Sequence, residues 1–148
     1  MDSNVGGLGK ATGGYVLPSG CSWNPKIVNY LKEGPVEVRN RRGRLVAKLE
    51  YKHDKLNGLC KFYENGDLVK EVYYVNDLAN GWGCEYDEFG DVLMNCYYEN
   101  GEKKSQLKKS KKKEGWFDEL DLKSGEVAST CLYNEKHERV GKCYFFKN

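Results

Sequence analysis

The sequence is poor in residues that break strands and in residues that most often carry catalysis, with three prolines and two histidines among its 148 residues. It has no run of about 18 apolar residues, so no membrane span is predicted. The N-terminus lacks a charged head followed by an apolar stretch, which argues against a secretory signal. We therefore expect a cytoplasmic protein, with attachment to a membrane surface left open as an alternative.

What the chain does contain suits a folded domain rich in strands. Hydrophobic residues make up 39% and charged residues 31%, and there are eleven tyrosines and seventeen glycines. The net charge of +2 is unevenly distributed, because seven lysines lie within residues 103–113. Without them the chain would be acidic, so its basic character is local.

A glycine and tyrosine pattern recurs with a period of about 23 residues, which is typical of repeat architectures. Each unit opens on a glycine, at Gly34, Gly58, Gly81, Gly115 and Gly141. In four units a second glycine precedes a tyrosine by eight residues, giving Tyr51, Tyr74, Tyr98 and Tyr133. Apolar residues alternate before each tyrosine, as on one face of a strand. We predict an all-β, elongated stack of antiparallel hairpins in a single-layer sheet, because one isolated hairpin is only marginally stable.

One unit carries a recognisable motif. The segment Tyr63-Glu64-Asn65-Gly66, with Tyr74 and the later Asn80-Gly81-Trp82, resembles a MORN repeat of the variant with a Tyr-x-Asn-Gly turn. The resemblance covers residues 33–148 and is interrupted by a lysine-rich insertion at 102–114. It implies a scaffold that binds protein partners, touches phospholipids and associates into homodimers through the array ends. Such repeats also occur as accessory domains of larger enzymes.

Residues 1–32 do not follow the repeat. The glycines of the first fourteen residues predict a flexible arm. Asn24 and Pro25, followed by an apolar stripe from Ile27 to Leu31, predict a short helix that caps the edge of the first repeat. No phosphate-binding loop motif is present.

The cysteines and histidines do not form a convincing reactive site. None of the six cysteines lies in a CxxC pair, so reduced thiols are the expectation. Cys96 and Cys131 stand where other units have aliphatic residues, which favours packing, although a disulfide or metal between stacked units stays open. His53 and His137 fall in predicted turns. We therefore predict no catalytic residues, no metal and no cofactor.

Two groups of residues are candidates for contact with partners. The aromatic group comprises Tyr73, Tyr97, Trp82 and Trp116. The basic group comprises Lys103, Lys104, Lys108, Lys109, Lys111, Lys112 and Lys113. Each mobile lysine near an anionic bilayer contributes about 1 kcal/mol. The insertion contains no arginine, which argues against specific nucleic-acid recognition.

These features predict a non-catalytic scaffold for protein–protein interaction. Peripheral binding to anionic phospholipid membranes through the insertion is the first alternative. An accessory domain fragment of a larger enzyme is the second.

Overall fold

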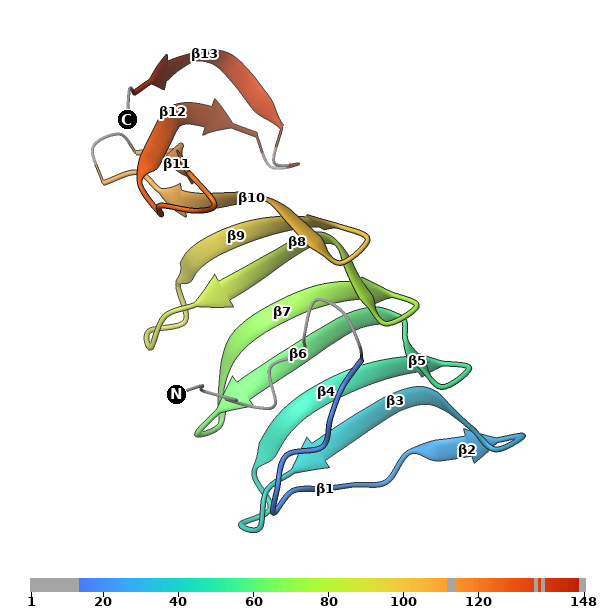
Figure 1. Cartoon of the computed structure of the whole chain (residues 1–148). Helices are drawn as coiled ribbons and strands as arrows, with labels where there is room; N and C mark the ends of the chain where they lie inside the picture. The colour runs from blue at the N-terminus through green and yellow to red at the C-terminus, as the bar shows by residue number, and fades with distance from the viewer. Residues whose placement is uncertain (1–13, 112–113, 135, 137, 147–148) are drawn as a thin grey trace.

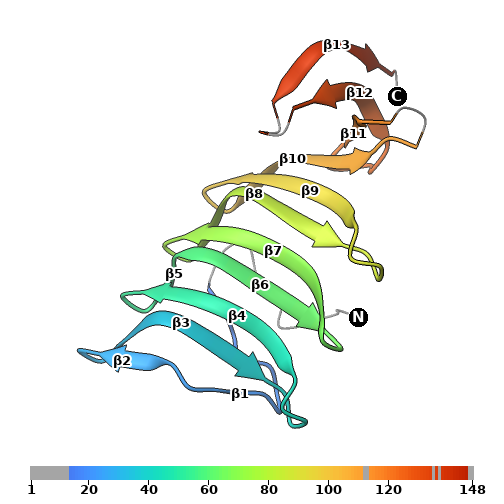
Figure 2. The same cartoon turned by 180° about the vertical axis from the view of Figure 1, so that it is seen from behind.

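The computed structural model describes residues 14–111, 114–134, 136 and 138–146. Over this part of the chain there are thirteen strands and no helix. The strands form one open antiparallel sheet in which successive hairpins stack along the chain, from β1 at one end to β13 at the other (Figures 1 and 2). The predicted all-β stack of hairpins is confirmed.

The strand order follows the sequence, except that two short strands lie beside the main path. The first strands are β1 (Ser22–Trp23), β2 (Lys26–Val28), β3 (Leu31–Arg39), β4 (Leu45–Lys52), β5 (Lys55–Leu56), β6 (Gly58–Glu64) and β7 (Asp67–Val75). The others are β8 (Leu78–Tyr86), β9 (Val92–Glu99), β10 (Glu102–Lys109), β11 (Trp116–Leu120), β12 (Val127–Tyr133) and β13 (Arg139–Phe145). The short strand β2 pairs with β3, and β5 pairs with β4.

The opening glycine and the tyrosine of the first three repeats pair across the hairpin. Directly opposed pairs are Gly34 with Tyr51, Gly58 with Tyr74, and Gly81 with Tyr98. Gly58 has a φ of 126°, a conformation that side chains other than glycine rarely adopt. The three tyrosines are buried on one face of the sheet. The recurring spacing in the sequence therefore corresponds to the pairing of glycine with tyrosine across the two strands of these hairpins.

Successive hairpins are joined by tight turns whose two central residues both have positive φ. These turns are Asn29-Tyr30, His53-Asp54, Asn76-Asp77 and Asn100-Gly101. Such turns match the right-handed twist of the strands they connect. In two of them the aspartate also reaches back to the preceding hairpin. Asp54 accepts a hydrogen bond from the backbone N–H of Lys32 at 3.2 Å, and Asp77 accepts one from Leu56 at 2.7 Å.

The main core lies on one face of strands β3 to β9, which we call the inner face. Its buried members include Val38, Leu49, Phe62 and Val72. The segment of residues 14–23 crosses this face, in front of the sheet in Figure 1 and behind it in Figure 2. Tyr15 stacks on Phe62 with ring centroids 6.4 Å apart. The N-terminal segment therefore covers apolar side chains that a single-layer sheet would otherwise expose.

The predicted capping helix is wrong. Residues 26–28 form β2, which pairs with β3, while Ser22 and Trp23 of β1 pair with the other end of β3. The stripe that resembled a helix is split by Asn29 and Tyr30, whose φ values are 52° and 69°. A turn of this kind cannot continue a right-handed helix. The predicted role of covering the first edge is nevertheless served by β1 and β2.

The lysine-rich insertion that interrupts the repeats contributes a strand to the sheet. Residues 102–109 form β10, which pairs with β9 on one side and β11 on the other. Leu107 is buried at its centre, and this single apolar anchor is enough to place the segment in the sheet. Lysine is disfavoured in strands only weakly, because its stem can lie along the sheet while the ammonium reaches water.

Strand β10 reverses the repeats that follow it. Because it adds one strand between the third and fourth units, β11 runs in the direction opposite to β8, its counterpart in the third unit. When the strands of a hairpin run in the reverse direction within the same sheet, the side chains that pack in the other hairpins lie on the opposite face of the sheet. Cys131 accordingly lies on the outer face, opposite Phe117, whereas Cys96 lies on the inner face opposite Gly83. The sheet therefore has a second packed region, on the outer face, around Leu107 and Cys131.

Candidate functional site

Three of the four predicted aromatic contact residues share the outer face of β7 to β9. We call Tyr73, Trp82 and Tyr97 the outer aromatic surface. Trp82 and Tyr97 are directly opposed across β8 and β9, and their ring centroids are 5.1 Å apart. Tyr73 points to the side opposite its buried neighbour Tyr74 and is 51% exposed. Aromatic rings of this kind offer large contact area at low conformational cost.

The fourth residue, Trp116, is on the opposite face. It pairs with Leu132 across β11 and β12 and contacts Tyr144, with ring centroids 5.7 Å apart. The structure therefore does not bring Trp116 together with the other three aromatic residues, because the extra strand β10 reverses its repeat. Trp82 and Trp116 both follow an opening glycine, and nothing in either repeat alone signals the reversal.

A polar network borders the outer aromatic surface on the same face, and the sequence analysis did not find it. The Cys84 thiol donates a hydrogen bond to Asn95 Oδ1 at 3.0 Å, and the Tyr86 hydroxyl donates one to Glu71. Burial and the Glu71 carboxylate together raise the pKa of Tyr86. Glu71 also lies 3.8 Å from the ammonium of Lys61. The network spans β6 to β9. Its members Lys61, Glu71, Cys84 and Asn95 oppose one another in one transverse row of the sheet, and Tyr86 lies two residues beyond Cys84 on β8.

The side chains of the predicted basic group are divided between the two faces of the sheet, because successive residues of β10 point to opposite sides. Lys108 faces inward opposite Asp118, whereas Lys109 faces outward opposite Phe117. Lys104 forms an ion pair with Glu102 at 3.0 Å. Lys103 lies opposite Tyr98 on the inner face. Lys112 and Lys113 lie outside the described residues.

Three lysines of the group border one groove at the C-terminal end of the sheet, although the side chains of Lys108 and Lys109 point to opposite faces. Lys108, Lys109 and Lys111 line it. The acidic side chains of Asp118 and Glu126 line the same groove, and they offset part of the positive charge. Its apolar lining is Leu120, Val127 and Phe146. The groove can therefore hold an anionic group beside apolar atoms.

The inner face carries a separate half-buried lysine. Lys70 lies directly opposite Glu85 in the pairing of β7 with β8. Burial lowers the pKa of Lys70, and the attraction of Glu85 partly offsets this effect. This side chain marks the place where the inner face changes from apolar to charged.

The structure assigns one disulfide, between Cys131 and Cys143. The two residues are directly opposed in β12 and β13, with Cα atoms 4.4 Å apart. The expectation of fully reduced thiols is wrong for this pair, because antiparallel pairing brings the side chains of opposed residues together. Cys21, Cys60, Cys84 and Cys96 are free.

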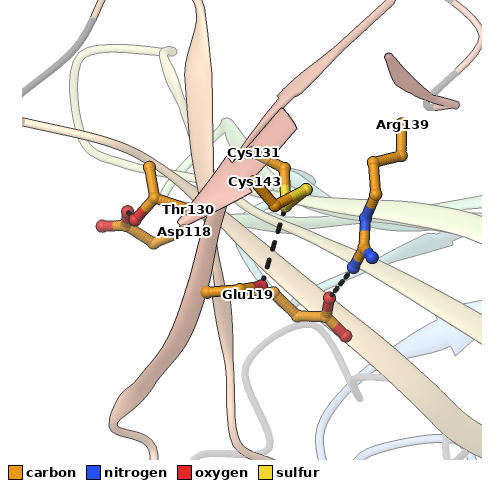
Figure 3. The surroundings of a disulfide bond; sticks show 7 residues. Asp118, Glu119, Thr130, Cys131, Arg139 and Cys143 are labelled. Carbon is orange, nitrogen blue, oxygen red and sulfur yellow. Dashed lines mark hydrogen bonds and ion pairs between the residues drawn. A yellow bond between two sulfur atoms is a disulfide. The ribbon is translucent and has the colours of Figure 1, made fainter. Parts of the chain in front are cut away.

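The surroundings of the disulfide divide cleanly between the two faces of the sheet. Arg139 and Glu119 form an ion pair at 2.9 Å on the side of the disulfide. The Thr130 hydroxyl donates a hydrogen bond to Asp118 at 2.7 Å on the other side (Figure 3). This arrangement shows directly that Cys131 and Thr130 alternate across the sheet.

The structure describes one of the two histidines. His53 is exposed in its turn, with Nδ1 2.8 Å from Glu33 Oε2. His137 lies outside the described residues. Among the residues that are described, no three His, Cys, Asp or Glu side chains gather where they could hold a metal ion. Within the same residues, no helix is long and apolar enough to cross a membrane.

Comparison with known proteins gives limited similarity. No family model matches the chain, and no curated protein matches it. Among solved structures, it is similar to TarM, with 9% identity and a TM-score of 0.45 over 86% of this chain. A mutant of S. aureus TarM in complex with Fondaparinux, alpha-GlcNAc-glycerol and UDP gives 8% identity and a TM-score of 0.46 over the same share of this chain. The chain spans only 21% of the length of either TarM chain.

Proposed function

We propose that this protein is a non-catalytic repeat scaffold that binds a protein partner through its outer aromatic surface. The observation that carries the proposal is the grouping of Tyr73, Trp82 and Tyr97 on one face while the opposite face of the same strands is buried. Aromatic residues are enriched at the energetic centres of protein interfaces. The half-buried Glu71 and Cys84 of the polar network would form part of the rim.

The stacked hairpins also support the resemblance to MORN repeats, which we retain as part of this proposal. We further propose a cytoplasmic location, self-association through the array ends, and no requirement for a cofactor. The interpretation as an accessory domain of a larger enzyme stays a prediction.

Affinity capture tests the scaffold proposal. The purified protein is immobilised and incubated with an extract of the source cells, and the retained proteins are identified. The variant Y73A/W82A/Y97A should lose the proteins that the wild type retains, because truncation of an interface centre typically costs 2 kcal/mol or more, roughly thirtyfold in affinity. The matched control is Phe89→Ala, which removes an exposed aromatic ring from a turn outside this surface. Equal capture by the triple variant and the wild type would contradict the proposal.

A second candidate function is peripheral binding to anionic membranes, and the groove bordered by Lys108, Lys109 and Lys111 favours it. We expect co-sedimentation with phosphatidylcholine vesicles only when phosphatidylserine is included, and a decline as salt is raised. The variant K108Q/K109Q/K111Q should abolish it, whereas Y73A/W82A/Y97A should not. Absence of sedimentation at low salt would remove this candidate.

A further inference from the structure

Apart from the disulfide, the described side chains of strand β13 contact the sheet only at its surface, where Tyr144 packs on Trp116 and Arg139 pairs with Glu119. The strand pairs with β12 alone among the described strands. None of its described side chains is buried, and Tyr144 and Phe145 are 52% and 72% exposed. The burial that anchors β3 to β9 is therefore missing here, and the strand depends on other interactions.

The backbone ladder between β12 and β13 is also interrupted. The register shifts between Cys131 and Leu132, beside the disulfide. Before the shift, residues 129–131 of β12 pair with β13. After it, only Leu132 and Tyr133 of β12 are paired. An interrupted ladder has fewer cooperative hydrogen bonds, so a covalent link at this point carries more of the attachment.

The two sulfur atoms differ in their environment. Cys131 is fully buried, and its Sγ lies 3.8 Å from Ser129 Oγ. Cys143 is only half-buried, on the edge of the described sheet. An incoming thiolate therefore has access to Cys143, and the second packed region shields Cys131.

We propose that the Cys131–Cys143 disulfide is a redox latch, which holds β13 on the sheet when oxidised and releases it when reduced. The reductant is a dithiol, either a small molecule or a dithiol oxidoreductase. Its thiolate attacks Cys143 Sγ, the S–S bond breaks, and Cys131 leaves as a thiolate that takes up a proton. The second thiol of the reductant then resolves the mixed disulfide. The products are two protein thiols and one cyclic disulfide, so two electrons and two protons pass to the protein.

Release of β13 changes what the protein presents. The backbone of β12 then loses its hydrogen-bonded neighbour, and an unpaired strand edge accepts strands from other chains. The latch therefore couples the redox state to the availability of a strand-pairing edge. This role is separate from the outer aromatic surface, which lies on β7 to β9.

Hydrogen exchange on the full chain tests the latch. The oxidised protein should show four alkylatable thiols after denaturation, and dithiothreitol should raise the count to six. Reduction should speed amide exchange of residues 139–145 at least tenfold and leave β3 to β9 unchanged. Cys143→Ser should show the fast exchange without reductant, and Cys84→Ser, which keeps the latch, should behave as the wild type.

Two results would overturn the proposal. One is six alkylatable thiols after treatment with oxidised glutathione, because the disulfide would then not form. The other is unchanged exchange of β13 in protein whose disulfide is shown by mass to be open. The second measurement uses the wild-type chain, so it holds even where the serine variant fails to fold.

Discussion

Asp77 and Leu56 exchange two hydrogen bonds between successive hairpins. The Leu56 N–H donates to Asp77 Oδ1 at 2.7 Å, and the Asp77 N–H donates to the Leu56 carbonyl at 3.0 Å. Leu56 is fully buried, and the Asp77 carboxylate satisfies its N–H. The same device recurs one repeat earlier between Asp54 and Lys32. It links neighbouring repeats without any contribution from the core.

Removal of the Asp77 carboxylate should weaken the stack. Asp77→Gly tolerates the positive φ of the turn, and Gly101 naturally holds the equivalent position in a later turn. We expect the free energy of unfolding to fall by about 1–3 kcal/mol, because a buried donor loses its partner. Urea denaturation measures the change. Asp77→Asn keeps an acceptor oxygen and should lose much less, and equal losses in both variants would show that the hydrogen bond is unimportant.

Tyr74→Phe should not destabilise the protein. The hydroxyl of Tyr74 is buried without a hydrogen-bond partner among the described residues, and the side chain is 1% exposed. A buried unsatisfied hydroxyl costs about 1–3 kcal/mol, so its deletion should raise the melting temperature or leave it unchanged. The control is Tyr74→Ala, which should destabilise by about 3–5 kcal/mol because it leaves a cavity in the inner core. A marked loss of stability in the phenylalanine variant would reveal a partner for the hydroxyl.

Stability should fall at acidic pH. Hydrogen bonding from the Lys32 side chain holds the pKa of Asp54 below its ordinary value, and the backbone N–H of Ser124 does the same for Asp121. A lowered folded-state pKa contributes stability above the unfolded-state pKa of about 3.9, and this contribution is lost as pH falls through the folded value. Denaturation midpoints should therefore decrease below about pH 4. Asp54→Asn should flatten this dependence, and an unchanged slope would contradict the assignment.

Cys60 should be the slowest of the free thiols to react. It is fully buried, and burial raises its pKa to about 11. Because the thiolate is the nucleophile, only about one Cys60 side chain in a thousand is reactive at pH 8. Alkylation with iodoacetamide under native conditions, followed by peptide mass spectrometry, should label the half-buried Cys21 well before Cys60. Simultaneous labelling would indicate that the inner core opens readily.

The repeat and its core were predictable because each depends on residues close in sequence. The spacing of Tyr74 from its glycines predicted both the hairpin and the buried side of its strand. The turn at Asn29 and Tyr30 was missed because the apolar residues around it also fit a helical stripe. Asparagine tolerates positive φ, and this was the one local sign of a turn.

The position of Trp116 could not be deduced from its own repeat. It depends on whether residues 102–109 form a strand or a loop, and lysine-rich segments are poor indicators of strands. Leu107 is the only strongly apolar residue in that segment. The Cys131–Cys143 pair was equally hidden, because opposition across β12 and β13 requires the register of a turn that sequence spacing does not define.

Strand β10 reverses the orientation of the hairpins that follow it in the sheet. Equivalent surfaces of the third and fourth hairpins face opposite sides of one thin sheet. Molecules bound to these surfaces would therefore lie on opposite sides of the sheet. An array with an even number of strands between those hairpins would present both to the same side. The lysine-rich segment therefore fixes the relative orientation of the hairpins on either side of it.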